Sequence, residues 1–197
     1  MMNLFDTWDI SGIKVNDNGL QRYINLDARS VPRSSGRSVK TQFHKSDYNI
    51  VERLMNHLMA AGHRGKKHRY SSGHNGGKAV KVYSLVFDTL KLIEERLKKN
   101  PVEVLVKAIE NAAPREEITT IEYGGARYPK SVECAPQRII DLTFRYMVQG
   151  AYAAAFGKKK KMYQSLADEI INAYNLNMQS NAIAKKLELE RQADSAR

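Results

Sequence analysis

Residues 118–138 read ITTIEYGGARYPKSVECAPQR, and this stretch decides the expected fold. Two runs of β-prone residues flank the pair Gly124-Gly125, and segments with helical periodicity lie on both sides. Two adjacent glycines between such runs predict a β-hairpin with a tight primed turn, because both turn residues need a positive φ. Since an isolated two-stranded hairpin is only marginally stable in water, we expect this one to be stabilised by a molecule that it contacts.

Composition limits the class of protein. The chain has 197 residues and a net charge of +11, with 32 Lys and Arg against 21 Asp and Glu. This excess indicates a polyanionic partner, and nucleic acid fits it better than an anionic membrane. No apolar run approaches the roughly 18 residues of a membrane span, and the N-terminus lacks the pattern of a signal peptide. The single cysteine, Cys134, fits a reducing compartment. We therefore expect a cytoplasmic protein with no membrane partner.

Six segments carry apolar residues at helical spacing. The predicted helices cover residues 47–62, with Asp47 as the N-cap, then 79–99, 101–113, 136–156, 162–174 and a final stretch from Ser180. The third has the clearest boundaries, because Asn100 can cap it, Pro101 suits its first position and Pro114 ends it. The expected fold is mainly α, a bundle of about six helices with one protruding β-hairpin between helices three and four. We divide the chain into a basic extended N-terminal arm (1–46), a helical body (47–179) that includes the hairpin (118–135), and a C-terminal helical tail (180–197).

Positive charge gathers in five clusters, which together suggest one broad phosphate-binding surface. They are the run 29–45, the loop 63–78, the hairpin tip around Arg127, Arg138 with Arg145, and the block 158–161. Between Ala28 and Lys45 there are five basic residues and no acid, which fits either a disordered tail or, as the total charge favours, an extension that orders along phosphates. The loop 62–78 carries five Lys or Arg and no acid. The run 158–161 is either a solvated face or a phosphate contact. Our candidate RNA-binding residues are Arg33, Arg37, Lys40, Arg64, Lys66, Lys67, Arg69, Lys78, Arg127, Lys130, Arg138, Arg145, Lys158, Lys159, Lys160 and Lys161.

The predicted hairpin tip consists of Tyr123, Gly124, Gly125 and Tyr128. Aromatic side chains beside cations suit stacking on unpaired bases. The alternative for the two tyrosines is cross-strand packing within the hairpin.

Signatures of enzymes and metal sites fail when they are checked. The segment from Gly73 to Ala79 is similar to a phosphate-cradling loop, but Ser72 replaces its first glycine and Ala79 replaces the residue that would hold magnesium. A structural zinc site needs paired ligands at short spacing, and Cys134 has no neighbouring cysteine. We therefore expect no catalytic residue, no cofactor and no metal.

Several ordered motifs resemble a known family along nearly the whole chain. They are LFDTWD (4–9), GLQRYINL (19–26), IVERLM (50–55) with GKK (65–67), NPVEVL (100–105), ENAAPREE (110–117), YGGARYP (123–129), PQR (136–138), LADEII (166–171) and AIAKKLELER (182–191). The order and spacing of these motifs resemble the universal small-subunit ribosomal protein seven family in its archaeal and eukaryotic form.

This resemblance implies a non-catalytic protein that binds the 3′ major domain of small-subunit rRNA and nucleates assembly of the subunit head. It implies a hairpin near the exit tRNA site and the mRNA path, with small-subunit proteins nine and eleven as neighbours. Among the cations, it assigns Lys66, Lys67, Arg127 and Arg138 to RNA contact. Two other readings of the residues are a DNA-binding architectural protein and an RNA-modifying enzyme. The first would prefer duplex DNA, and the second would need a cofactor loop or a coupled acid and base.

Overall fold

The computed structural model describes residues 3–63 and 74–197. Within them the elements follow the order α1 (Asn18–Gln21), the 3₁₀ turn η1 (His44–Asp47), α2 (Ile50–Leu58), α3 (Ala79–Leu97), α4 (Pro101–Ala112), β1 (Glu116–Tyr123), β2 (Ala126–Glu133), α5 (Pro136–Ala155), α6 (Met162–Tyr174) and α7 (Asn181–Ser195). The prediction of a mainly α fold with a hairpin after the third long helix is confirmed. The sequence pattern did not predict α1, which is a single turn.

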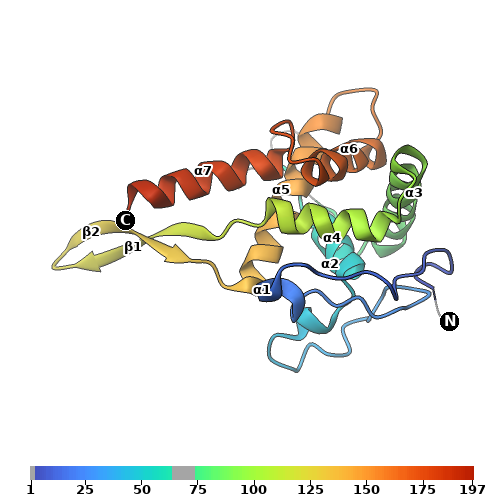
Figure 1. The fold of residues 1–197 in the computed structure, drawn as a ribbon, viewed down its shortest axis with the longest axis horizontal. Helices are drawn as coiled ribbons and strands as arrows, with labels where there is room; N and C mark the ends of the chain where they lie inside the picture. The colour runs from blue at the N-terminus through green and yellow to red at the C-terminus, as the bar shows by residue number, and fades with distance from the viewer. Residues whose placement is uncertain (1–2, 64–73) are drawn as a thin grey trace.

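Helix α4 runs through the core of the helical body. Its N-terminus follows the prediction, because the Asn100 side chain accepts a hydrogen bond from the Val102 amide at 3.0 Å and Pro101 takes the first helical position. Leu105 and Ile109 are fully buried, and the helix packs against α3, α5, α6 and α7. The core is therefore built around α4, with the other helices placed on its sides (Figure 1).

Helix α2 begins later than predicted, and Asp47 is not its N-cap. Asp47 ends the turn η1, and Tyr48 then adopts an extended backbone with φ −77° and ψ 139°. Asn49 is the cap, since its side-chain oxygen accepts a hydrogen bond from the Val51 amide at 2.9 Å. Because the extended Tyr48 separates the two elements, helical hydrogen bonds cannot continue from Asp47 into α2, and the predicted start was wrong.

The hairpin pairs β1 with β2 from Glu116 opposite Glu133 to Tyr123 opposite Ala126. Gly124 and Gly125 form the two-residue turn with φ values of 59° and 79°, which the primed turn requires. The strands project from the body, and α7 runs beside their inner part (Figure 1).

The C-terminal end of the chain holds the inner part of this hairpin. The Ser131 amide donates a hydrogen bond to the Ala196 carbonyl at 3.3 Å, and Arg197 forms an ion pair with Glu116. The chain itself therefore supports the base of the hairpin, whereas the outer part extends beyond α7 (Figure 1).

The N-terminal segment contributes side chains to the hydrophobic core. Leu4 is fully buried, and the indole Nε1 of Trp8 donates a hydrogen bond to Glu94 Oε2 of α3 at 2.8 Å. The Phe5 ring packs on Phe87 of α3 with the ring centroids 5.7 Å apart. Sequence periodicity did not reveal this contribution, because Phe5 lies in a turn with a φ of 53° and turns have no repeating apolar spacing.

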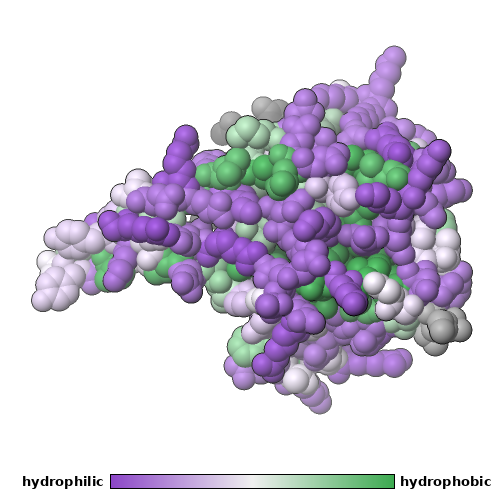
Figure 2. Space-filling view, in the orientation of Figure 1, coloured by the Kyte–Doolittle hydropathy of each residue, from purple (hydrophilic) through white to green (hydrophobic). Residues whose placement is uncertain are grey.

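Polar side chains cover most of the face of the body that Figure 2 shows, with apolar patches visible between the helices. Across residues 3–63 and 74–197, no helix is both long and apolar enough to span a bilayer.

Candidate nucleic-acid interface

The N-terminal segment carries three of the predicted cations on its surface. Arg33, Arg37 and Lys40 are all exposed. Next to Arg33, the Ser34 amide and hydroxyl both donate hydrogen bonds to Glu52 Oε1 of α2, at 2.7 and 2.6 Å. Because the carboxylate of Glu52 is buried, it fixes this segment on α2 and leaves the arginines outside.

Only part of the predicted basic loop can be placed. Arg64, Lys66, Lys67 and Arg69 lie outside the described residues. Lys78 is exposed at the N-terminus of α3, and Lys160 is exposed in the turn before α6. The two line the same groove, which has a volume of about 600 Å³. The fold thus brings together one residue from each of two basic clusters that are far apart in the sequence.

Two predicted cations and both tip tyrosines stand out from the body on the hairpin. Arg127 forms a long ion pair with Glu122, at 3.5 Å, and both side chains remain exposed, as does Lys130. Tyr123 is 82% exposed and Tyr128 is 58% exposed. Tyr128 lies opposite Ile121, whereas Tyr123 lies opposite Ala126. Since Tyr123 is so exposed, cross-strand packing does not account for its presence at the tip.

Arg138 is held by a carboxylate at the base of the hairpin. Its Nε and Nη2 atoms donate hydrogen bonds to Glu117 Oε1 and Oε2 at 2.6 and 2.7 Å. These hydrogen bonds, more than any other cause, raise the pKa of the Arg138 guanidinium. The Arg138 side chain is still 54% exposed, so its remaining donors can reach a phosphate. Arg145, two turns further along α5, is exposed.

The lysine run before α6 contains residues in different environments. Lys160 forms an ion pair with Asp168, which also pairs with Arg96. Lys161 lies over the ring of Tyr163, with Nζ 5.9 Å from the centroid. Lys158 and Lys159 are exposed. The run is therefore partly anchored to the body and partly extended into solvent.

A charged cluster that the sequence did not reveal joins α2 to α5. Arg53, which is only 2% exposed, donates a hydrogen bond to Asp141 Oδ1 at 2.9 Å. His57 Nε2 and Lys45 Nζ each lie 3.2 Å from the Asp141 carboxylate. Burial alone would raise the pKa of Asp141, but the hydrogen bonds from His57 and Arg53 and the nearby charges lower it well below its ordinary value. Arg53 and His57 lie one turn apart on α2, but no motif in the sequence connects them with Lys45 of η1 and Asp141 of α5.

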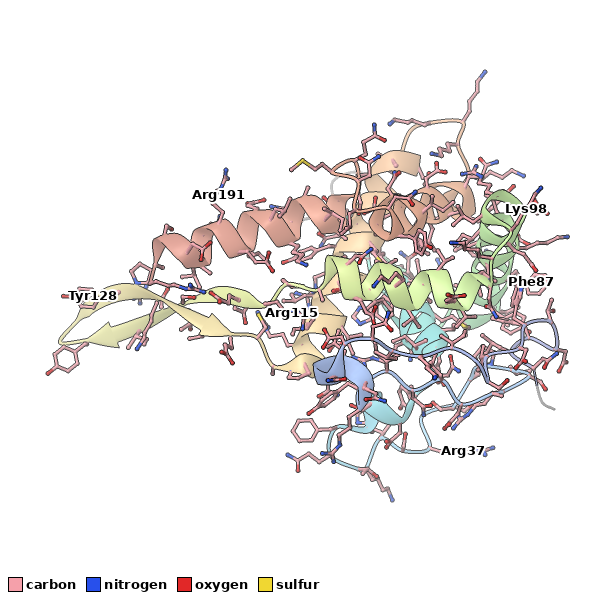
Figure 3. All side chains as sticks on the ribbon, viewed as in Figure 1. Arg37, Phe87, Lys98, Arg115, Tyr128 and Arg191 are labelled. Carbon is pink, nitrogen blue, oxygen red and sulfur yellow. The ribbon has the colours of Figure 1, made fainter. Side chains whose placement is uncertain are left out.

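The clusters do not all lie together. Figure 3 shows Tyr128 at the far end of the hairpin and Arg37 on the N-terminal segment, in different parts of the molecule. Arg191 points outward from α7 in the same view. The hairpin tip and the cations of the body are therefore separate surfaces. Among residues 3–63 and 74–197, no group of His, Cys, Asp and Glu could hold a metal ion.

The fold and its exposed cations define a basic, mainly helical protein with a projecting hairpin. Sequence comparison identifies the family. The profile of the family described as ribosomal protein S7p/S5e matches residues 21–197, and the chain belongs to this family.

Three relatives match over nearly their whole lengths. Small ribosomal subunit protein uS7 of Nanoarchaeum equitans is 52% identical to this chain, and the aligned region covers 100% of this chain and 99% of that protein. The protein of the same name from Methanosphaera stadtmanae is 48% identical, and the alignment covers 98% of this chain and 97% of that protein. The one from Methanothermobacter thermautotrophicus is 44% identical, and the alignment covers both chains completely. The resemblance to the archaeal form of the family is confirmed.

Proposed function

We propose that this protein is a structural, non-catalytic component of the small ribosomal subunit that binds rRNA directly. It binds the 3′ major domain of the small-subunit rRNA and nucleates assembly of the subunit head in the cytoplasm. Family membership supports this proposal, because the relatives are small-subunit ribosomal proteins by name.

One structural observation carries the proposal: buried carboxylates bind donors inside the protein, while cations from several elements remain on the surface. Glu110 accepts hydrogen bonds from the Asn16 and Asp17 amides at 2.6 and 3.1 Å. Glu169 accepts them from the Ser180 hydroxyl and the Ala182 amide at 2.8 and 3.0 Å. Both carboxylates point into the protein, although Glu110 also pairs with Lys107 at 3.3 Å. The net charge of +11 and the exposed cations of several elements together present a field that attracts phosphates.

In this proposal the protein binds RNA by its shape and its charge, and it catalyses no chemical reaction. The major groove of an A-form helix is too narrow for side chains to read, so contacts go to phosphates and 2′-hydroxyl groups. On the body we assign these contacts to exposed cations, namely Arg33, Arg37, Lys40, Lys78, Arg138, Arg145, Lys158, Lys159, Lys160 and Lys161. Arg64, Lys66, Lys67 and Arg69 complete the set on the loop outside the described residues.

The hairpin has a separate role in this proposal. Its outer part, with Tyr123, Tyr128, Arg127 and Lys130, lies near the exit tRNA site and the mRNA path. In the proposed function, small-subunit proteins nine and eleven are neighbours of the whole protein in the subunit. The exposure of both tyrosines supports a partner at the tip, since exposed aromatic rings suit stacking on unpaired bases.

Filter binding across a salt series tests the proposal. The purified protein is titrated with a 3′ major-domain rRNA transcript, and an unrelated structured RNA and duplex DNA serve as competitors. We expect tight binding that resists both competitors, with a steep salt dependence of roughly −0.7 to −0.9 in log–log slope per phosphate contact. Equal affinity for the three nucleic acids would contradict the assignment and would favour a general DNA-binding or RNA-binding protein.

A further inference from the structure

The hydrogen-bond pattern of the hairpin shows which backbone groups face its two outer edges. In an antiparallel pair, opposite residues alternate between those that bond each other and those whose amide and carbonyl groups point outward. The Cys134 amide donates a hydrogen bond to the Arg115 carbonyl at 2.9 Å, one step before the first pair of the strands. Counting along the register from there, Thr120 and Glu122 of β1 direct their amide and carbonyl groups away from β2.

The outer edge of β2 is closed to a further strand. Among its outward positions are Pro129, which has no amide hydrogen, and Ser131, whose amide donates a hydrogen bond to the Ala196 carbonyl at 3.3 Å. A proline and a covering segment of chain are two means by which proteins protect the edge of a sheet. A further strand therefore cannot form a regular ladder along β2.

The outer edge of β1 has neither form of protection. Thr120 and Glu122 are exposed, and across residues 3–63 and 74–197 their amides find no acceptor in the protein. Helix α7 runs beside the inner part of the hairpin only, and this part of β1 extends beyond it (Figure 1). A row of unpaired amide and carbonyl groups on an exposed strand is a template for pairing with another chain.

Strand β1 is also acidic, in a protein whose net charge is +11. Its sequence, EEITTIEY, contains three acids and no Lys or Arg. The two inner acids pair with arginines. Glu122 lies on the open part of the strand, where its side chain is 61% exposed and its ion pair with the exposed Arg127 is long, at 3.5 Å. The open edge therefore attracts cationic side chains.

We propose that the outer edge of β1 binds an extended, basic segment of a second protein by strand addition. The main chain of that segment would pair with the outward groups of Thr120 and Glu122. Since side chains alternate between the two faces of a sheet, a cationic side chain would lie beside Glu122 and an apolar one beside Ile121, which is 46% exposed. Addition of an extended peptide to a free strand edge is a recurring mode of recognition, in which main-chain hydrogen bonds supply affinity and side chains supply specificity.

Charge distinguishes this occupant from RNA and from a second copy of the chain. An RNA backbone would bring phosphates to a strand that has three acids and no base. Two copies paired through β1 would place two such strands side by side. The cations of the hairpin, Arg127 and Lys130, are both on β2. The two strands thus differ in charge, and β1 suits a basic protein segment.

Titration with defined peptides tests the edge in the isolated full chain. The probe is an acetylated and amidated Lys-Val-Lys-Val-Lys-Val peptide, and the matched peptide has Glu in place of Lys. Nuclear magnetic resonance of the isotope-labelled protein should show saturable shifts of the Thr120 and Glu122 amides with the lysine peptide. At a free peptide concentration of about ten times its Kd, hydrogen exchange at these two amides should slow about tenfold. Equal binding of the glutamate peptide, or shifts confined to other residues, would overturn the proposal.

Two substitutions separate main-chain pairing from charge. Thr120→Pro removes an outward amide that makes no bond to β2, so we expect the hairpin to form and the lysine peptide to lose its binding. Thr120→Val is the matched control, because it keeps the amide and should bind like the unaltered protein. Glu122→Gln should weaken binding about two- to fivefold, the effect of an exposed ion pair.

The outcomes of these variants are decisive in either direction. Cross-strand nuclear Overhauser contacts check the hairpin of each one. If Thr120→Pro forms the hairpin and binds like the unaltered protein, strand addition is refuted. If it does not form the hairpin, Glu122→Gln decides, and an unchanged affinity there refutes the proposal. These tests use the protein without RNA, so their result is independent of whether the proposed rRNA binding holds.

Photo-cross-linking in reconstituted small subunits identifies the occupant. Benzoylphenylalanine replaces Thr120 on the open edge and, as the control, Lys130 on β2. We expect the probe at position 120 to attach to a Lys-rich or Arg-rich peptide of another protein, identified by mass spectrometry, and the probe at position 130 not to attach to that peptide. Attachment at position 120 only to RNA, or to a second copy of this chain, would overturn the proposal.

Discussion

Glu117 and Arg138 form a bidentate ion pair between strand β1 and the first turn of α5, with N–O distances of 2.6 and 2.7 Å. The pair lies where the hairpin joins the body, close to the buried thiol of Cys134. Burial is the main cause that raises the pKa of this thiol to about 11, so it is expected to be unreactive near neutral pH. Arg138 thus helps to fix the direction of the hairpin, and in the proposed function its exposed donors also contact RNA.

Removing Glu117 should separate these two roles of Arg138. Glu117→Gln frees the guanidinium, and we expect the affinity for the rRNA transcript to rise by up to about fivefold, the equivalent of the roughly 1 kcal/mol of a partly exposed ion pair. Filter binding measures this change. A double-mutant cycle with Arg138→Gln should give a coupling free energy of at most about 1 kcal/mol in unfolding. Unchanged RNA affinity in Arg138→Gln would exclude this residue from the interface.

The Asp141 cluster should dominate the acid sensitivity of the fold. Asp141→Asn leaves the buried Arg53 without its carboxylate, so we expect a loss of about 3–5 kcal/mol in the free energy of unfolding. Asp168→Asn is the matched control, because its partners Arg96 and Lys160 are exposed, and it should cost no more than about 1 kcal/mol. Urea denaturation measures both. Equal losses in the two variants would contradict the account of the cluster.

The pH dependence of this contribution has a definite sign. Because the pKa of Asp141 is lowered in the folded protein, its stabilisation is present above its ordinary value of 3.8 and is lost as the pH falls from there toward the folded value. The difference in unfolding free energy between the unaltered protein and Asp141→Asn should therefore shrink below about pH 4. A difference that stays constant between pH 2 and 6 would show that the folded pKa is not lowered.

Gly150 allows α5 to approach α6 and α7 closely. A Cβ atom on Gly150 would lie 2.8 Å from Asn181 Cβ and 2.8 Å from the Glu169 carboxyl group. We expect Gly150→Ala to lower the free energy of unfolding by about 1–3 kcal/mol, since buried atoms must move to accommodate the methyl group. Gly76→Ala is the control, because a Cβ atom there meets nothing within 4 Å. Thermal unfolding of the two variants should differ clearly, and equal midpoints would refute the close approach.

Shortening the hairpin should separate rRNA binding from the later steps of translation. Replacement of residues 120–129 by Asn-Gly keeps the pair of Thr119 and Lys130 and supplies a favoured two-residue turn. We expect unchanged affinity for the 3′ major-domain transcript, because the cations of the body remain. Subunits reconstituted with this variant should bind tRNA more weakly at the exit site. Loss of head assembly would contradict the separate role of the hairpin.

The regular parts of this fold were predictable because their residues repeat with a period. The stripes in α3, α4, α5 and α6 and the Gly124-Gly125 turn are local patterns that specify local structure. The core contribution of Leu4 and Trp8 has no such pattern, since these residues flank a short turn and pair across it, and the hydrogen-bond partner of Trp8, Glu94, is on α3. The start of α2 was mispredicted because Asp47 and Asn49 are both good caps, and only the extended backbone of Tyr48 decides between them.

The candidate interface was predictable in composition and not in arrangement. Runs of cations can be read from the sequence, and the exposure of Arg33, Lys78 and Lys158 agrees with that reading. The pairing of Arg138 with Glu117 and of Lys160 with Asp168 depends on how the helices and the hairpin meet. The number of residues between two charged side chains does not show whether they form such an ion pair.

Hydroxyl-radical footprinting of the complete small-subunit rRNA with this protein alone tests the central claim most directly. The account predicts that the purified protein protects backbone positions confined to the 3′ major domain, and that these protections disappear when an excess of the 3′ major-domain transcript is added. Protections spread over all domains of the rRNA, or none at all without other ribosomal proteins, would contradict the claim that this protein binds rRNA directly and nucleates assembly of the head.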